Sequence, residues 1–268
     1  MFEYMRAFTH GGSFHADDVF TAAFLKILNP NIKIERGFIV SKNYDGFVFD
    51  IGFGEFDHHS EPREERENGI KYAAFGKVWR KYAPLYYSDF VVSSVEKSFI
   101  MDLDNSDNTG SYNSVSFIVN CFNPFWNEDS TKEKQDSQFN EIVCYAEVFL
   151  KRIIDKYVHT EQGMEFLKEA QKKSKNGVVI LDRYVPWESV LTADNTKVII
   201  FPSNRGGYNA ERLKNSGFEF PSDWWGTQEP KSKAVGLNFC HASGFMCNFE
   251  TEEDAINAVY TILRDKNI

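Results

Sequence analysis

The stretch YMRAFTHGGSFHADDVFTAAFLKIL, residues 4–28, decides the fold of the first half of the chain. Residues 4–9 predict a β-strand, and the polar residues 10–13 after it predict a turn. A helix is predicted next, because apolar side chains recur three or four residues apart and share one face: Val19, Phe20, Ala23, Phe24, Ile27 and Leu28. The stretch therefore predicts a strand, a loop and a helix in that order.

The residues that follow continue this alternation. Asn29-Pro30-Asn31 ends the predicted helix, because proline does not continue one. Residues 32–40 predict a second strand and residues 46–51 a third, whose apolar run indicates burial on both faces. Strands that alternate with helices are typical of a parallel sheet, so we expect an α/β fold.

Histidines and carboxylates follow two of these strands. His10, His15 and Asp17 come after the first strand, whereas Asp50 and the segment Asp57-His58-His59 lie at and after the end of the third. Ligands of such sheets bind outside the carboxyl ends of the strands. We therefore expect these side chains to meet at one edge of the sheet.

The rest of the chain predicts two further parts. Helices are expected at 72–82 and 89–99, before an acidic cluster at 102–107, and again at 139–157 and 161–173. Strands at 178–181, 198–201 and 236–240 and a closing helix at 251–264 predict a smaller β-rich unit. We expect a first domain over 1–125, a helical connector over 126–175 and a second domain over 176–268.

Composition and charge limit the classes of protein to which this chain can belong. The chain has 42% hydrophobic and 26% charged residues, which is typical of a globular fold, and its net charge of -9 disfavours a broad electrostatic surface for nucleic acid. A local phosphate site stays compatible with that charge when bound cations offset it. The four cysteines have no CxxC spacing, and no secretion signal or transmembrane span is predicted, so we expect a cytoplasmic protein.

Imidazole and carboxylate ligands together favour a transition metal. They suit Mn²⁺, Zn²⁺, Co²⁺ or Fe²⁺ better than Mg²⁺, which prefers oxygen ligands and keeps its waters. Two such ions about 3.5 to 4 Å apart can activate water and stabilise the in-line displacement of a phosphate ester. Asp50, at the end of a buried strand, is the candidate for the carboxylate that bridges them.

Plainer interpretations of these residues stay open at this point. Asp17 could cap the helix beside two surface imidazoles, and Asp18 is interpreted as solvated or capping. Among the acidic residues at 102–107 we favour Asp107 as a further metal ligand, then Asp104, against a solvated acidic turn. Trp224-Trp225 could stack on a base or pack between domains.

Several blocks of the chain resemble one known superfamily. Residues 9–18 (THGGSFHADD), 56–59 (FDHH) and 104–108 (DNSDN) look like the DHH phosphoesterase superfamily. More narrowly, residues 122–127 (FNPFWN), 185–187 (VPW) and 241–245 (HASGF) are similar to the melanocyte proliferating gene one family. Together these blocks extend the resemblance over nearly the whole chain.

The resemblance implies a parallel-sheet DHH phosphoesterase domain and a smaller α/β substrate-binding domain, joined by a helical linker, with the active site between the domains. It also implies a 3'-to-5' exonuclease activity on RNA. The metal ligands that it implies are His10, His15, Asp17, Asp50, His58 and Asp107. His59 would lie near the scissile phosphate, and the second domain would contact the substrate through Arg212, His241, Ser243 and Gly244.

These residues are compatible with three functions. The leading hypothesis is a metal-dependent phosphodiesterase that shortens single-stranded RNA with two Mn²⁺ ions, Asp50 and His59 being its catalytic residues; Mg²⁺, Co²⁺ and Zn²⁺ are alternative metals. A second is hydrolysis of a small phosphoanhydride or dinucleotide. A third is a non-catalytic nucleotide- or RNA-binding module with a structural metal. A homodimer is left open, and no membrane partner is expected.

Overall fold

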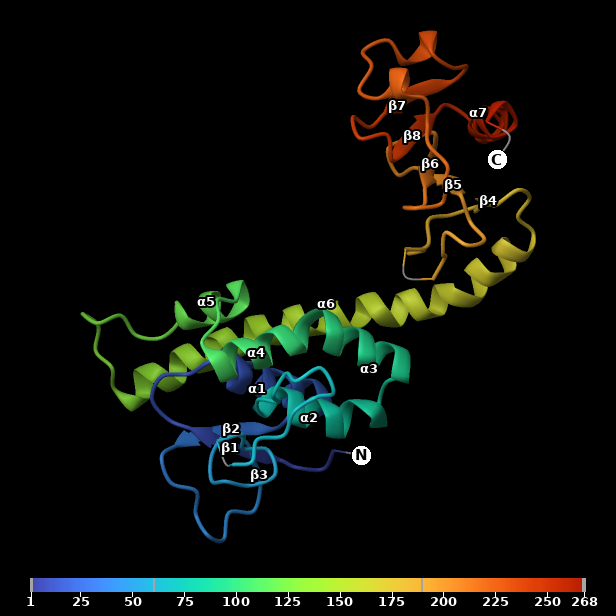
Figure 1. Cartoon of the computed structure of the whole chain (residues 1–268). Helices are drawn as coiled ribbons and strands as arrows, with labels where there is room; N and C mark the ends of the chain where they lie inside the picture. The colour runs from blue at the N-terminus through green and yellow to red at the C-terminus, as the bar shows by residue number, and fades with distance from the viewer. Residues whose placement is uncertain (1, 60, 189, 267–268) are drawn as a thin grey trace. The chain divides into compact units, whose positions relative to one another are not determined.

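The chain forms two compact units, Met1–Val158 and His159–Ile268 (Figure 1). The computed structural model describes residues 2–59, 61–188 and 190–266. Each unit has a sheet of its own, so the expectation of an α/β protein with a parallel-sheet part and a smaller second part is confirmed. Each unit is described by itself below.

The sheet of unit 1 has three parallel strands in the order β2-β1-β3. They are β1 (Arg6–His10), β2 (Lys33–Gly37) and β3 (Phe47–Val48), so the second and third strands are shorter than predicted. β2 ends at Gly37, which pairs with His10, the last residue of β1. Val48 is only half-buried, so the predicted burial of the third strand on both faces is wrong.

Helices of unit 1 gather on one side of this sheet (Figure 1). Two of these helices meet through an aromatic pair: the ring centroids of Phe24 and Trp79 lie 4.9 Å apart, and both side chains are fully buried. The helices are α1 (Ala16–Leu28), α2 (Ala74–Tyr82), α3 (Asp89–Val95), α4 (Met101–Thr109), α5 (Ser114–Asn120) and the first part of α6 (Lys132–Lys172), with a 3₁₀ turn at Ala83–Leu85 and a π turn at Glu96–Ile100.

Helix α6 is one continuous helix of 41 residues, where two helices were predicted. Residues 158–160 between the two predicted helices hold neither proline nor glycine, so nothing in the local sequence ends the helix there. Gly163 does not break it, and a Cβ at that position would meet Val185 Cγ1 at 2.4 Å. One face of the helix packs into the core of unit 1, and Leu167 packs into that of unit 2.

Unit 2 has a five-stranded mixed sheet in the order β4-β5-β6-β8-β7. The strands are β4 (Val178–Ile180), β5 (Val198–Pro202), β6 (Tyr208–Arg212), β7 (Leu237–Cys240) and β8 (Met246–Phe249). Only β4 and β5 are parallel. β6 and β8 were not predicted, because six of their nine residues are partly exposed and no apolar run marks them.

Helix α7 (Glu252–Asp265) closes unit 2 as predicted, and Thr251 caps it by accepting the N–H of Asp254. Two cores line the two faces of the sheet, one under α7 and one beside the end of α6. Short 3₁₀ turns occur at Ser222–Trp224 and Pro230–Ser232. Among the described residues, no helix is both long and apolar enough to cross a membrane.

Candidate active site

The loop from β1 to α1 places four candidate side chains. His15 is the N-cap of α1, and the Asp18 carboxylate accepts its backbone N–H at 3.0 Å, as in a capping box. His10 donates from Nδ1 to the carbonyl of Gly11, 3.0 Å away. Asp17 and Asp18 are fully buried, so the capping interpretation of Asp18 is confirmed and the solvated one is wrong.

The His10 ring faces two carboxylates with its other nitrogen. Nε2 lies 3.0 Å from Asp18 Oδ2 and 3.3 Å from Asp50 Oδ2. Because Nδ1 carries the proton, a neutral ring would present a lone pair to these oxygens, so the arrangement needs either a second proton on Nε2 or a metal ion between the three atoms. Adjacent ligands of an ion with bonds of about 2.1 Å lie about 3 Å apart, so these atoms are spaced as ligands of one ion are.

Asp50 links this group to the Asp-His-His segment. Its φ of 53° lies in the left-handed region, which aspartate tolerates better than most residues, and its N–H donates to the carbonyl of Phe56. Its Oδ1 lies 3.2 Å from His58 Nε2. One buried carboxylate therefore stands between the rings of His10 and His58.

Asp57 orients its neighbours and does not join the cluster. Its carboxylate accepts the N–H groups of Phe53 and His59, and its Oδ1 lies 2.7 Å from His59 Nδ1. Since an ionised carboxylate only accepts, His59 carries its proton on Nδ1 and leaves Nε2 for a metal or a phosphate. The side chain of His58 is buried, whereas that of His59 is 54% exposed.

The acidic residues of α4 separate into different environments. Asp107 Oδ2 lies 3.2 Å from His58 Nε2, and its Oδ1 lies 4.0 Å from His15 Nδ1. Asp104 faces away from the cluster and pairs with Arg66 at 2.6 Å, while Asp102 is exposed. All three are helical, so the expected alternative of an acidic turn is wrong.

Three groups of side chains have the spacing of metal ligands within the described residues. Asp50 belongs to two of them. The groups are His10, Asp18 and Asp50; Asp50, His58 and His59; and His15, Asp17 and Asp107. All six predicted metal ligands thus lie in these groups, together with His59 and the unpredicted Asp18.

The electrostatics of the cluster favour a bound cation. Burial and the nearby charges of Asp50 and Asp107 raise the pKa of Asp17 well above its usual range, and its Oδ1 is buried without a hydrogen-bond partner. Burial also disfavours charge on Asp50 and His10. Hydrogen bonds with His10 and His58 nevertheless hold the pKa of Asp50 at about 2, and those with Asp18 and Asp50 raise that of His10 to about 11. These residues fit divalent metal ions.

A hollow of about 370 Å³ opens beside this cluster. His15 and Asp107 form one side of it, and α5 with the loop before it forms the rest. Tyr112 and Phe117, both exposed, have rings 6.4 Å apart at this place. Asn113 and Ser116 add polar groups to this lining.

Residues that the sequence interpretation left without a role hold the β1–α1 loop. Asn123 accepts the N–H of Phe14 at 3.0 Å and donates to its carbonyl at 2.9 Å. Arg36 donates to the carbonyl of Gly12 at 2.8 Å and lies over the ring of Phe139. The position of Asn123 in the FNPFWN block was the signal in the sequence that this residue has a role. The sequence did not show which residue it contacts, because Phe14 lies 109 residues away.

The four predicted substrate residues of unit 2 lie together where β6 ends and β7 turns into β8. Arg212 Nε donates to the carbonyl of Gly244 at 3.3 Å. His241 Nδ1 accepts the N–H of Ser243 at 3.1 Å, so its proton is on Nε2. Gly244 has a φ of 63°, and a Cβ there would meet the ring of Trp225 at 2.2 Å.

The two tryptophans before this turn differ in environment. Trp224 is buried in the core under α7, which excludes it from stacking on a base. Trp225 stays 36% exposed, and its Nε1 donates to the carbonyl of Phe220. The Trp225 ring packs against Gly244, so the HASGF block needs a glycine there because any side chain would collide with the ring.

Comparison with known proteins agrees with this arrangement. The chain is 24% identical to a MYG1 protein of Dictyostelium discoideum, over 92% of the chain and 93% of that relative. It is also 24% identical to MYG1 proteins of Saccharomyces cerevisiae (96% and 94% covered) and Chlamydia pneumoniae (97% of each). No solved structure matches the chain significantly. A family model for an uncharacterised protein family, UPF0160, named MYG1 exonuclease, matches residues 6–262, so the chain belongs to this family over nearly its whole length.

Proposed function

We propose that the protein is a metal-dependent phosphodiesterase that removes nucleotides from the 3' end of short single-stranded RNA. The observation that carries this proposal is the position of Asp50, one carboxylate shared by two groups with metal-ligand spacing. A shared carboxylate is what a pair of ions needs in order to hold one water between them. The exonuclease name of the family supports the same reaction class.

The residues of the cluster have different roles, either as metal ligands or in contact with the phosphate. His10, His15, Asp17, Asp50, His58 and Asp107 hold two divalent ions, and Asp18 adds an oxygen beside His10. When bound, the ions lower the pKa of water and stabilise charge on the phosphate. His59, held by Asp57, directs Nε2 at the scissile phosphate. Mn²⁺ is the preferred metal, because the ligands mix nitrogen and oxygen, with Co²⁺, Zn²⁺ or Mg²⁺ as substitutes.

Each unit has residues of its own that we assign to substrate binding. The hollow beside His15 and Asp107 receives the terminal nucleotide, whose base stacks on Tyr112 or Phe117. In unit 2, Arg212, His241, Ser243 and Gly244 offer a guanidinium, an imidazole N–H, a hydroxyl and closely approaching backbone to the phosphate chain. The cytoplasmic location, the homodimer and the domain bounds 1–125, 126–175 and 176–268 stay predictions.

The decisive experiment is turnover of a 5'-labelled oligoribonucleotide with Mn²⁺. The wild type should release mononucleotides stepwise. Asp50→Ala should be slower by more than about 100-fold, because loss of a metal ligand lowers activity more than loss of a residue that only supports a ligand. Asp102→Ala is the matched control: this carboxylate is exposed on α4 and lies outside the three groups, so activity should persist.

Product analysis separates the rival functions. Cleavage of pyrophosphate or a dinucleotide with no shortening of the oligonucleotide would favour the small-molecule hydrolase. Protein that retains two metals and binds the oligonucleotide without forming product would favour the binding module. Full turnover by Asp50→Ala in added Mn²⁺ would overturn the proposed centre.

A further inference from the structure

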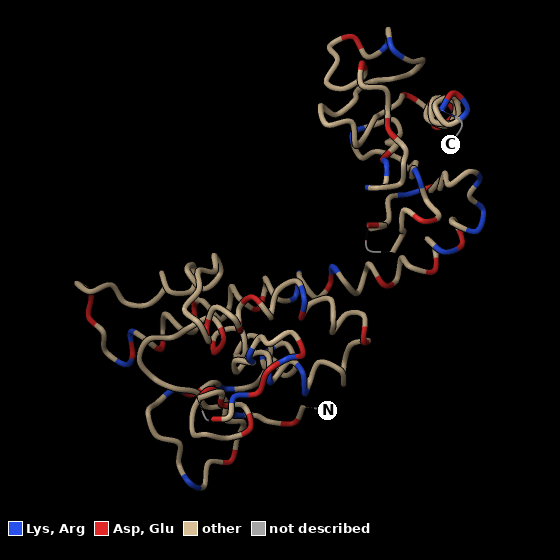
Figure 2. Tube along the Cα trace, in the orientation of Figure 1, with Lys and Arg blue, Asp and Glu red and all other residues tan. Residues whose placement is uncertain are grey.

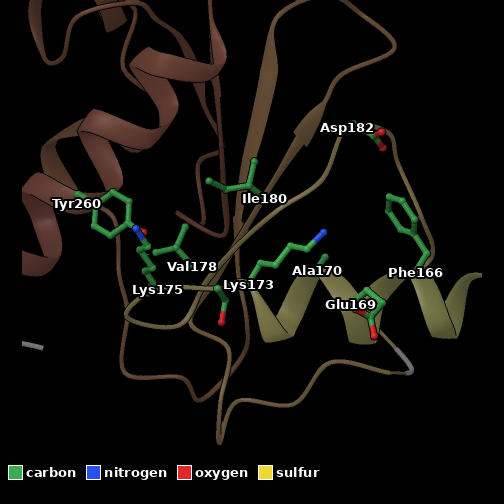
Figure 3. Close-up of a pocket in the computed structure, with 10 residues that line it drawn as sticks. Phe166, Glu169, Ala170, Lys173, Lys175, Val178, Ile180, Asp182 and Tyr260 are labelled. Atoms are coloured by element: carbon green, nitrogen blue, oxygen red, sulfur yellow. The ribbon is translucent and has the colours of Figure 1, made fainter.

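A cavity in unit 2 is lined by none of the side chains assigned so far. It measures about 650 Å³ and is bounded by the end of α6, the strand β4 and helix α7 (Figure 3). β4 is an edge strand, so the cavity opens along the unpaired side of the sheet. Its volume falls in the range of small-molecule sites.

The lysines that line this cavity have no close ion-pair partner among the described residues. Two carboxylates line it, but Glu169 pairs with Lys172 at 2.6 Å and Asp182 pairs with Arg183 at 2.9 Å. Lys173 and Lys175 also line it, and neither lies within 4.0 Å of a carboxylate oxygen of the described residues. The hydrogen bond from Lys172 and, less strongly, the charge of Lys173 nevertheless lower the pKa of the Glu169 carboxyl. Figure 2 shows the basic run at this end of α6, and Figure 3 shows Lys173 extending between Ile180 and Phe166. The cavity therefore favours an anion.

The remaining wall is apolar and partly exposed. Ile180 is 37% exposed and Phe166 36%, and Val178 and the ring of Tyr260 lie at the other end beside Lys175 (Figure 3). The Arg183 guanidinium lies 5.5 Å from the centre of the Phe166 ring, and the aromatic and branched side chains together offer an apolar surface to a planar ring. An inorganic anion would leave this surface unused.

The cavity is separate from the His241 turn. β4 and β7 are opposite edges of the five-stranded sheet, four strand spacings apart. At about 4.8 Å per spacing this is about 19 Å. A mononucleotide in the cavity therefore cannot be the same molecule that contacts His241.

We propose that this cavity is a binding site for a nucleoside monophosphate. Lys173 holds the phosphate as a point charge, Lys175 adds positive potential, and the base and sugar lie against Phe166 and Ile180. The site does not depend on the proposed reaction, because it contains none of the candidate metal ligands.

The test is a titration of the full chain, carrying ¹³C-labelled isoleucine methyl groups, with AMP. The δ1-methyl signal of Ile180, assigned by its loss in Ile180→Val, should shift with a dissociation constant below about 1 mM. Adenosine and ribose 5-phosphate, which each lack one half of the ligand, should bind at least about tenfold more weakly. Inorganic phosphate is the probe for the charge alone.

Variants locate the phosphate. Lys173→Gln should weaken AMP binding about tenfold, because a hydrogen bond to a charged group is lost. Lys168→Gln is the matched control from the same helix: Lys168 pairs with Glu165 at 2.7 Å, and neither residue lines the cavity, so binding should change by less than about twofold.

Three results would overturn the site. One is an Ile180 signal that does not move up to about 5 mM AMP. Another is that both lysine variants weaken AMP binding equally, which would show that positive charge attracts AMP without a specific site. The last is a shift by inorganic phosphate as large as that by AMP, which would remove the role of the apolar wall. None of these outcomes bears on metal-dependent turnover, which is measured separately with Asp50→Ala.

Discussion

Some side chains that are distant in sequence from the metal candidates hold them in place. Asn123 is the clearest example. Both of its hydrogen bonds go to the backbone of Phe14, the residue before His15. Asn123→Ala should lower the free energy of unfolding by about 1 to 3 kcal/mol, because two partly buried backbone groups lose their partner. It should also lower kcat/KM, because His15 loses its support. Urea unfolding and Mn²⁺-dependent turnover measure the two effects.

Two variants calibrate this prediction. Asn123→Asp keeps the acceptor for the Phe14 N–H but loses the donor, so it should fall between wild type and Asn123→Ala. Asn257→Ala changes an exposed asparagine on α7 and should stay within about 0.5 kcal/mol of wild type. Equal stability of Asn123→Ala and Asn257→Ala would contradict the supporting role.

Glu211 gives unit 2 a pH dependence of its own. Burial and the like charge of Glu188 raise the pKa of Glu211 from 4.5 to about 7. The folded state therefore holds this proton more tightly than the unfolded state, so stability declines as the pH rises from about 4.5 and levels off above about 7. Glu211→Gln should match wild type at pH 5 and exceed it at pH 8 by about 1 to 2 kcal/mol, after allowance for partial exposure.

Urea unfolding at the two pH values checks that window. Glu219→Gln, at an exposed position beyond the end of β6, serves as the control and should not alter the pH dependence. A constant difference between Glu211→Gln and wild type at both pH values would refute the assignment to this carboxyl.

At the scale of elements, the contact of α2 with α4 positions Asp107. Gly76 donates its N–H to Asp104 Oδ1 at 3.2 Å, and a Cβ on Gly76 would lie 1.9 Å from Asp104 Oδ2 and 2.8 Å from Arg66 Nη2. The two helices can approach only because this position has no side chain. Since α4 carries both Asp104 and Asp107, this contact sets the place of one metal candidate.

Gly76→Ala should therefore be destabilising although alanine is the better helix former. The gain of about 1 kcal/mol in helix propensity is outweighed by displacement of the buried Asp104–Arg66 pair, and we expect a net loss of about 1 to 3 kcal/mol with weaker metal binding. Calorimetric metal titration and urea unfolding measure both. Gly54→Ala, where a Cβ meets nothing within 4 Å, should leave both unchanged. Equal behaviour of the two variants would show that the helices adjust without cost.

At the scale of the molecule, the metal candidates all lie in unit 1, whose stability should depend on the cations. Four carboxylates, those of Asp17, Asp18, Asp50 and Asp107, lie close together and mostly out of water. A ligand at 100 times its dissociation constant contributes about 2.7 kcal/mol. Removing metal with EDTA should therefore lower the unfolding temperature and speed amide exchange in α1, while β5 in unit 2 stays protected. Asp50→Asn should respond little to EDTA, and an equal response in both proteins would contradict a cation at Asp50.

The sequence predicted the parts of this site that local order and strand topology control. His10 and Asp50 follow neighbouring parallel strands, and the carboxyl ends of such strands meet at one edge whatever the rest of the chain does. His58 was placed beside them for the same reason. The helix α1 and the two-part organisation followed from periodicity, which reports whether a residue faces the core.

Periodicity does not report which residue a side chain meets. The separation of Asp104 from Asp107 and the hydrogen bonds of Asn123 depend on contacts between residues 28 and 109 positions apart in the sequence. The strands β6 and β8 were missed because their burial comes from their neighbours and not from an apolar pattern of their own. By itself the sequence determined the kinds of elements and the ligands available at the sheet edge. Only the tertiary structure decided which carboxylates share a site, because long-range packing sets burial and distance.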